Sequence, residues 1–160
     1  IFVEKNTPRH IICRAGWMMG GGPKKDKKFI QKIMAQLKQG KRELFIVNDK
    51  LGTPTYTLDF ADNVKSLLQK ELWGLYNMVC SGVTSRFEVT QELIKVLGMT
   101  DVIKITPVQS DYWKKEYFAE RPSSERLINK KLELRGLNQM RDWRICLSEY
   151  IKNYYKEYVD

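Results

Sequence analysis

The sequence predicts an α/β fold in which strands alternate with helices around a largely parallel sheet. The short apolar run His10–Ala15 is rich in β-branched residues and is typical of a strand buried on both faces. Apolar residues at helical spacing follow over Phe29–Leu37, and the same alternation recurs in the second half of the chain. With 160 residues, 42% hydrophobic and 29% charged, the chain is long enough for one globular domain.

The first half contains clear boundary signals. Gly16–Pro23 holds four glycines and a proline, which predicts a loop at the end of the first strand. Asp26 is a good N-cap for the helix that follows, and Gly40 ends it. Glu43–Val47 predicts a strand. Gly52–Thr57 predicts an extended segment, because a residue before a proline is biased away from helix.

The second half repeats this pattern. A helix is expected after Asp59, and a strand over Leu75–Val79. The capping-box pattern Ser85–Glu88 opens another helix, which stops at Gly98 before a strand over Ile103–Val108. The polar and aromatic stretch from Ser110 to Pro122 has no clear period, so we expect a loop with short helical turns.

Helical segments are expected at both ends of the chain. The opening Ile1–Lys5 has the character of the tail of a helix, and it suggests that the sequence is a piece of a longer protein. The last helix begins at about Met140. Its apolar residues share one face, so it should dock on the body of the protein; they are Trp143, Leu147, Tyr150, Ile151 and Tyr154.

Charge and composition restrict the partners. Lys and Arg number 28 against 19 Asp and Glu, giving a net charge of +9 that attracts anions. Since no basic stripe or nucleic-acid motif accompanies this charge, a nucleic acid is not expected as a partner. No apolar run approaches the ~18 residues that span a bilayer, so no membrane association is expected. The three cysteines lack a Cys-x-x-Cys pair and suit a reducing compartment, by default the cytoplasm.

One aromatic residue and one polar segment are candidate ligand contacts. Trp17, within the glycine-rich segment, offers a flat ring for stacking on a base or sugar; the alternative is a core residue beneath the loop. Gly52–Thr57 concentrates hydroxyls and backbone groups that could bind a polar ligand, although a plain edge strand would have the same pattern.

Two basic features are candidate anion contacts. Lys24–Lys28 could attract a diphosphate or a nucleic-acid backbone, but a solvated helix start explains most of these lysines. Arg121 precedes Pro122 on a rigid turn that suits bidentate phosphate binding, and an ion pair with Glu120 or Glu125 is the alternative.

The sequence lacks the usual catalytic patterns. His10 is the single histidine, so neither a catalytic triad nor a histidine-rich metal site is expected. There is no glycine fingerprint of a dinucleotide-binding turn or a P-loop, and no tyrosine has a lysine four residues later. We therefore assign no catalytic residue and no metal ligand to this chain.

Six segments, in this order, carry a family resemblance: Arg14–Trp17, Asn48–Ala61 with its Gly-Thr-Pro-Thr-Tyr-Thr-x-Asp block, Gly74–Asn77, Ser85–Glu88, Arg121-Pro122 and Met140–Trp143. Together they resemble the C-terminal half of dTDP-4-dehydrorhamnose reductase, over about Ile11 to Tyr150. That enzyme belongs to the extended short-chain dehydrogenase/reductase superfamily of nucleotide-sugar reductases and epimerases. The resemblance implies the C-terminal part of a Rossmann-type fold, with residues 1–160 forming a single sugar-nucleotide-binding region.

The resemblance also implies what this chain lacks. In the family, the cofactor-binding turn and the Tyr-x-x-x-Lys pair lie upstream, so the N-terminal dinucleotide-binding half would be absent here. The chain would be the substrate-binding portion of a reductase that uses NADPH or NADH on a dTDP-4-dehydro-6-deoxy sugar. Alone, it should neither turn over nor bind the cofactor tightly. A non-catalytic regulatory subunit and a nucleotide-sugar epimerase remain alternatives.

Several site residues follow from the resemblance. Trp17 would lie against the sugar near the nicotinamide, and Gly16 would border the cofactor. Thr53, Pro54 and Thr55 would border the nucleotide-sugar cleft; Arg86 and Arg121 would lie on the diphosphate side. The expected partners are a nucleotide-diphosphate sugar and the missing half of the same protein, and the whole protein is compatible with a homodimer.

Overall fold

The computed structural model describes residues 2–113, 122–155 and 157, and it has an α/β architecture. Three two-stranded sheets are parallel: β1 (Ile11–Arg14) with β6 (Gly74–Asn77), β2 (Trp17–Met19) with β5 (Pro54–Tyr56), and β3 (Glu43–Val47) with β8 (Lys104–Val108). The predicted fold class is therefore confirmed.

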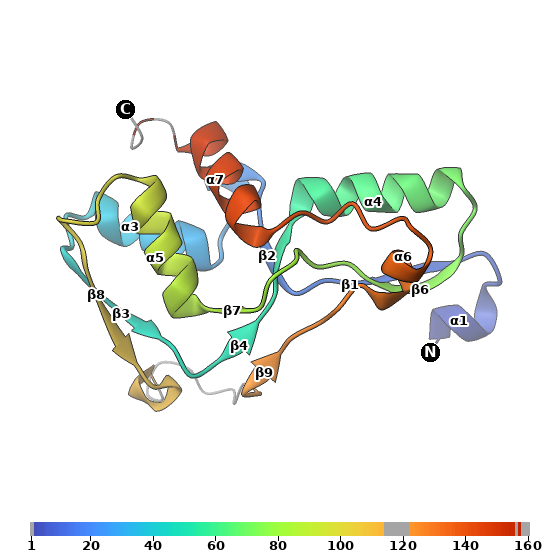
Figure 1. The fold of residues 1–160 in the computed structure, drawn as a ribbon, viewed down its shortest axis with the longest axis horizontal. Coiled ribbons are helices and arrows are strands. Elements are labelled where there is room, and N and C mark those ends of the chain that lie inside the picture. Colours follow the sequence, from blue (N-terminus) through green and yellow to red (C-terminus); the bar gives the residue numbers. More distant parts are fainter. Residues whose placement is uncertain (1, 114–121, 156, 158–160) are drawn as a thin grey trace.

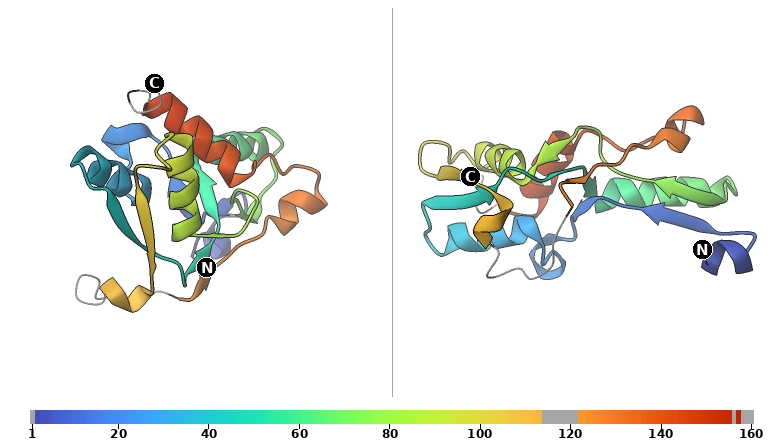
Figure 2. Two further views of the ribbon diagram at one scale, coloured as in Figure 1. Left: turned by 60° about the vertical axis from the view of Figure 1, so that its left-hand side comes forward. Right: turned by 90° about the horizontal axis from the view of Figure 1, so that it is seen from below.

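The molecule is elongated (Figure 1). A lobe at one end contains β3 and β8 with α3, α5 and α7, and an arm at the other end contains β1, β6, α4, α6 and α1, as Figure 2 also shows. The helices are α1 (Phe2–Asn6), α2 (Gly22–Lys25), α3 (Phe29–Lys38), α4 (Thr57–Gln69), α5 (Arg86–Val96), α6 (Lys130–Leu134) and α7 (Trp143–Tyr154). In the described part of the chain, none of these helices has the length and apolar character to cross a membrane.

A small three-stranded sheet lies between the lobe and the arm (Figure 1). Its central strand β4 (Leu51–Gly52) pairs antiparallel with β7 (Thr84–Ser85) and parallel with β9 (Ser124–Glu125). Gly52 is thereby placed opposite Thr84 on one side and Glu125 on the other. Three segments that are distant in sequence meet there.

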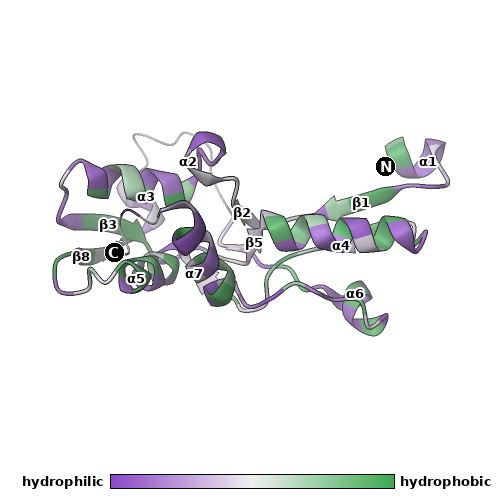
Figure 3. Ribbon diagram, turned by 90° about the horizontal axis from the view of Figure 1, so that it is seen from above, coloured by the Kyte–Doolittle hydropathy of each residue, from purple (hydrophilic) through white to green (hydrophobic). Residues whose placement is uncertain are grey.

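The core of the lobe is apolar and continuous. Figure 3 shows that β1 and β3 are mostly apolar, whereas α3, α4 and α7 carry both apolar and polar residues. One face of each lobe helix is buried, through Ile33 and Met34 of α3, Leu93 and Ile94 of α5, and Leu147 and Ile151 of α7. Burying each such side chain contributes about 1.5–3 kcal/mol to the free energy of folding.

Local signals placed many boundaries correctly. Ser85 and Glu88 form the predicted capping box: the Glu88 backbone N–H donates to Ser85 Oγ at 3.1 Å, and the Ser85 backbone N–H donates to Glu88 Oε2 at 2.7 Å. Gly40 and Gly98 follow α3 and α5 with φ of 81° and 64°, the left-handed conformation of a helix stop. The loop expected after Ser110 begins with a short 3₁₀ helix (Ser110–Trp113).

The prediction of a loop over Gly16–Pro23 is wrong in part, because Trp17–Met19 forms strand β2 and a short helix, α2, begins at Gly22. The backbone N–H of Trp17 donates to the Thr53 carbonyl at 2.9 Å, which brings β2 beside β5. Gly16 permits this approach, since a Cβ there would lie 2.0 Å from the Thr53 carbonyl oxygen. The pairing depends on a distant segment, so local composition could not show it.

Asp26 does not cap α3; the N-cap is Lys28. The carboxylate of Asp26 is buried, where it accepts hydrogen bonds from the Lys28 backbone N–H at 2.8 Å and the Tyr150 hydroxyl at 3.0 Å. Its role is to join the segment before α3 to α7. α7 docks as expected, although Tyr154 on the expected apolar face is 47% exposed.

Strand β1 is less covered than predicted. Ile11, Ile12 and Cys13 are half-buried and Arg14 is exposed, rather than buried on both faces. Among the described residues β1 has one neighbouring strand, β6, so one of its edges lacks a hydrogen-bonded partner.

Asn129 fixes the unpredicted helix α6 on the arm. Its buried amide accepts the Val79 backbone N–H at 2.9 Å and donates to the Val79 carbonyl at 2.7 Å. The side chain thus takes the place of a neighbouring strand for Val79. A contact across fifty residues leaves no local periodic signal, which is why α6 was missed.

An ion pair between the buried carboxylate of Asp59 and the partly exposed guanidinium of Arg141 joins α4 to the segment before α7. Arg141 Nη2 lies 2.6 Å from Asp59 Oδ1, Arg141 Nε lies 3.0 Å from Oδ2, and the Arg141 backbone N–H also donates to Oδ2. Burial raises the pKa of Asp59, but the hydrogen bonds from Arg141 outweigh it, so the pKa lies below the ordinary value. Asp59 is therefore a charged, fully partnered carboxylate in the interior.

We predict that Asp59→Asn lowers the free energy of unfolding by about 1–3 kcal/mol near neutral pH, because Arg141 loses one charged partner but stays partly exposed and keeps its ion pair with Glu149. Chemical denaturation of the two proteins measures this difference. Since folding lowers the pKa of Asp59, its contribution is present above the unfolded value of about 3.9 and is lost as the pH falls through the folded value. The difference between the proteins should shrink in acid; a difference independent of pH would contradict the assignment.

Candidate functional site

Five residues form a cluster at the surface beside β4. Trp17 begins β2, Phe29 begins α3, Gly52 lies in β4, Arg86 begins α5 and Glu125 lies in β9. Trp17, Phe29 and Arg86 are half-buried and Glu125 is exposed. We call these residues the Trp17 cluster.

The guanidinium of Arg86 lies over two aromatic rings. Its Cζ is 4.2 Å from the centroid of Trp17 and 4.7 Å from that of Phe29. Attraction between the cation and the ring faces favours this position. The planar head of Arg86 is therefore held against these two rings at the start of α5.

Gly52 lets the indole approach the backbone. A Cβ at position 52 would lie 2.4 Å from both Cε2 and Cζ2 of Trp17. Because no side chain fits there, glycine is required for the present position of the ring.

Glu125 holds the edge of the indole. Trp17 Nε1 donates a hydrogen bond to Glu125 Oε2 at 2.7 Å. A hydrogen bond to a charged acceptor is stronger than a neutral one, so the carboxylate fixes the rotation of the ring. The ring thus has a cation over its face and an anion at its edge.

The threonines expected at the cleft are buried and support this arrangement from behind. The Gly16 backbone N–H donates to Thr55 Oγ1 at 2.8 Å, and Thr55 Oγ1 donates to the Met78 carbonyl at 3.4 Å. Thr53 Oγ1 accepts the Leu127 backbone N–H at 3.3 Å. Pro54 is also buried, and its carbonyl accepts the Cys80 backbone N–H.

The structure brings some of the predicted site residues together. Trp17 and Arg86 are in direct contact, and Gly16, Thr53 and Thr55 lie directly behind them. Arg121 lies outside the described residues. Sequence reasoning missed the roles of Phe29, Gly52 and Glu125, because each reaches Trp17 through a contact distant in sequence.

The basic run before α3 faces water. Lys24, Lys25, Lys27 and Lys28 are all exposed. They precede Phe29 of the Trp17 cluster, so they add positive potential near it. Over the described ranges, no three His, Cys, Asp or Glu side chains are grouped as a metal site would require.

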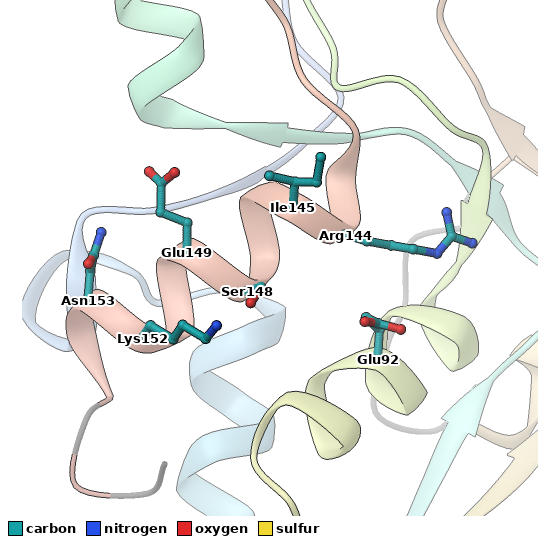
Figure 4. A pocket seen from close by; sticks show the side chains of 7 residues that line it. All are labelled: Glu92, Arg144, Ile145, Ser148, Glu149, Lys152 and Asn153. Carbon is teal, nitrogen blue, oxygen red and sulfur yellow. The ribbon is translucent and has the colours of Figure 1, made fainter. Parts of the chain in front are cut away.

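A second surface feature is a groove of about 540 Å³ between α5 and α7 (Figure 4). It is lined by Glu92 of α5 and by Arg144, Ile145, Ser148, Glu149, Lys152 and Asn153 of α7. Two of its charged groups are already engaged: Glu149 pairs with Arg141 at 2.6 Å, and Arg144 lies 3.8 Å from Asp142. None of the predicted site residues lines this groove, so the Trp17 cluster is the stronger candidate.

A family model described as the RmlD substrate binding domain matches residues 1–156. The chain belongs to this family. Among its relatives, the spore coat polysaccharide biosynthesis protein SpsK of Bacillus subtilis is 30% identical over 151 residues. That match covers 94% of this chain and 50% of the relative, so the chain spans about half the length of such relatives.

Solved structures give the same result. The dTDP-4-dehydrorhamnose reductase from Yersinia enterocolitica is 30% identical with a TM-score of 0.84, over 95% of this chain and 52% of that one. The dTDP-4-dehydrorhamnose reductase from Bacillus anthracis, solved in complex with NADP, is 26% identical with a TM-score of 0.82, over 95% and 51%. The resemblance seen in the sequence is therefore confirmed, together with the Rossmann-type relationship of the fold.

We predict that Gly52→Ala displaces Trp17 and lowers the free energy of unfolding by about 1–3 kcal/mol, because a Cβ at this position overlaps the indole. Denaturation followed by tryptophan fluorescence measures both effects. Leu51→Ala, at the neighbouring exposed position, is the control and should leave both the free energy of unfolding and the tryptophan emission close to the parent values. Wild-type stability and emission in Gly52→Ala would show that the close packing is absent in solution.

Proposed function

We propose that this chain is the substrate-binding C-terminal portion of an NAD(P)H-dependent nucleotide-sugar reductase. The reaction is reduction of a dTDP-4-dehydro-6-deoxy sugar in rhamnose-type biosynthesis. The observation that carries the proposal is the contact between Arg86 and Trp17 at the surface of an RmlD substrate binding domain. Such a site combines an aromatic ring for a sugar or base with a guanidinium for a diphosphate.

Each residue has a role in this proposal. Arg86 binds the diphosphate, with Arg121 as a second cation on the same side. Trp17 lies against the sugar. Thr53, Pro54 and Thr55 hold the β4–β5 segment in place rather than offering hydroxyls, because both hydroxyls are buried and hydrogen-bonded within the chain.

The cofactor is proposed to bind the whole protein and not this portion alone. The Bacillus anthracis relative was solved with NADP, which supports a nicotinamide cofactor here, either NADPH or NADH. Gly16 follows β1, so it lies where the substrate portion would meet the cofactor. In the reaction, the cofactor supplies a hydride, while this chain positions the sugar.

An upstream half of the same protein is the proposed partner of the arm. One edge of β1 lacks a partner strand among the described residues. Apolar side chains are exposed along the arm, including Phe2 at 79% and Leu68 at 51%. A dinucleotide-binding half would extend the sheet and cover such surface. The three cysteines are free thiols, which fits a reducing compartment such as the cytoplasm.

We predict that Arg86→Ala weakens binding of dTDP-rhamnose to this chain about tenfold or more, because a charged hydrogen bond to phosphate is lost. Isothermal titration calorimetry measures the Kd. Arg144→Ala, in the α5–α7 groove, is the matched control and should bind like the parent. The proposal of a diphosphate site at Arg86 fails if the two variants change the Kd equally.

A second prediction concerns turnover. The 160-residue chain should not consume NADPH in the presence of dTDP-4-dehydrorhamnose, whereas a protein that includes the upstream half should do so. Spectrophotometric measurement of NADPH checks both. Turnover by the chain alone would contradict an upstream catalytic half. Binding without turnover by the longer protein would favour a regulatory subunit.

A further inference from the structure

Glu125 is the charged member of the Trp17 cluster to which the proposed function gives no role. We propose that Glu125 is a specificity-determining residue, whose carboxylate accepts a hydrogen bond from a hydroxyl of the bound sugar while it holds Trp17. This inference rests on the proposed function and identifies the sugar as the part of the ligand that Glu125 contacts.

The backbone fixes Glu125 next to the ring. Glu125 lies opposite Gly52 in the β4–β9 pair, and the Leu51 backbone N–H donates to the Ser123 carbonyl at 3.0 Å. The neighbouring Arg126 turns to Ser124, whose Oγ accepts a hydrogen bond from Arg126 Nε at 2.8 Å. The pairing of β9 with β4 and the hydrogen bond from Trp17 Nε1 at 2.7 Å therefore hold Glu125 beside the indole.

The carboxylate has capacity for a second hydrogen bond. Oε2 accepts the indole N–H, whereas Oε1 accepts no hydrogen bond within residues 2–113 and 122–155. The side chain is exposed, so Oε1 can reach a ligand. An ionised carboxylate only accepts hydrogen bonds, and sugar hydroxyls are donors that it can bind.

The two charges of the cluster select different parts of a nucleotide sugar. Arg86 lies over the face of Trp17, and Glu125 lies at the nitrogen edge of the same ring. An anionic diphosphate is attracted to Arg86 and repelled by Glu125, so a ligand that spans both places its neutral hydroxyls at Glu125. The geometry favours an uncharged sugar over one that carries a carboxylate.

A structural role for Glu125 makes a different prediction. If Glu125 only orients Trp17, its loss should affect every ligand that uses the ring. If it binds the sugar, its loss should affect nucleotide sugars and spare the free nucleotide. Glu125→Gln separates the two roles, because the amide oxygen can still accept the indole N–H while the negative charge is lost.

The test compares dTDP-rhamnose with dTDP by calorimetry on the 160-residue chain. We expect Glu125→Ala to weaken dTDP-rhamnose about tenfold and dTDP less than about twofold, with a smaller loss for Glu125→Gln. Glu133→Gln, at an exposed position on α6, is the matched control and should bind both ligands like the parent. The indole N–H resonance of Trp17, assigned with Trp17→Phe, should stay close to its parent position in Glu125→Gln.

Equal losses for the two ligands, or no loss for either, would overturn the inference and leave the proposed function standing. An unmodified chain that binds dTDP and dTDP-rhamnose equally would also overturn it, since the sugar then makes no net contact. An unmodified chain that binds neither ligand would refute the proposed function, and the role of Glu125 with it.

Discussion

The buried carboxylate of Asp59 connects the parts of the chain on which the site depends. Asp59 lies in the first turn of α4, directly after β5, and it accepts hydrogen bonds from the side chain and backbone of Arg141 and from the Cys146 thiol. A buried charge without such partners would strongly disfavour the folded state. The ion pair therefore fixes α7 against the β5–α4 junction. Since β5 pairs with β2, the same contact stabilises the strand that begins with Trp17.

The site shows how a small set of long-range contacts defines a binding surface. Gly52 removes a side chain where the indole of Trp17 must lie, Arg86 covers the ring, and Glu125 holds its edge. Each contact comes from a different element, and the short strands β4, β7 and β9 bring those elements together. The surface therefore depends on the pairing of two-residue strands, which have little stability of their own.

Sequence reasoning succeeded where the signal was local. The Ser85–Glu88 capping box and the Glu43–Val47 strand required only neighbouring residues. It failed where distant segments decide the structure: β2 exists because of β5, and Asp26 is engaged by Tyr150 instead of capping α3. The same distinction holds for the site. Trp17 and Arg86 were found by residue type and resemblance, whereas the partners Gly52 and Glu125 become visible only through the register of β4 and β9. Thr53 and Thr55 were expected to contact the ligand. Both are buried, and they support the Trp17 cluster from behind.

The most direct test of the account is a map of where a nucleotide sugar binds. Two-dimensional ¹H–¹⁵N NMR of the chain, titrated with dTDP-rhamnose, reports every backbone amide and the tryptophan indoles. The account predicts that the largest shifts occur at the Trp17 indole and at the amides of Gly52, Arg86 and Glu125. Shifts confined to the α5–α7 groove lined by Arg144 and Lys152, or no shifts at all, would contradict it.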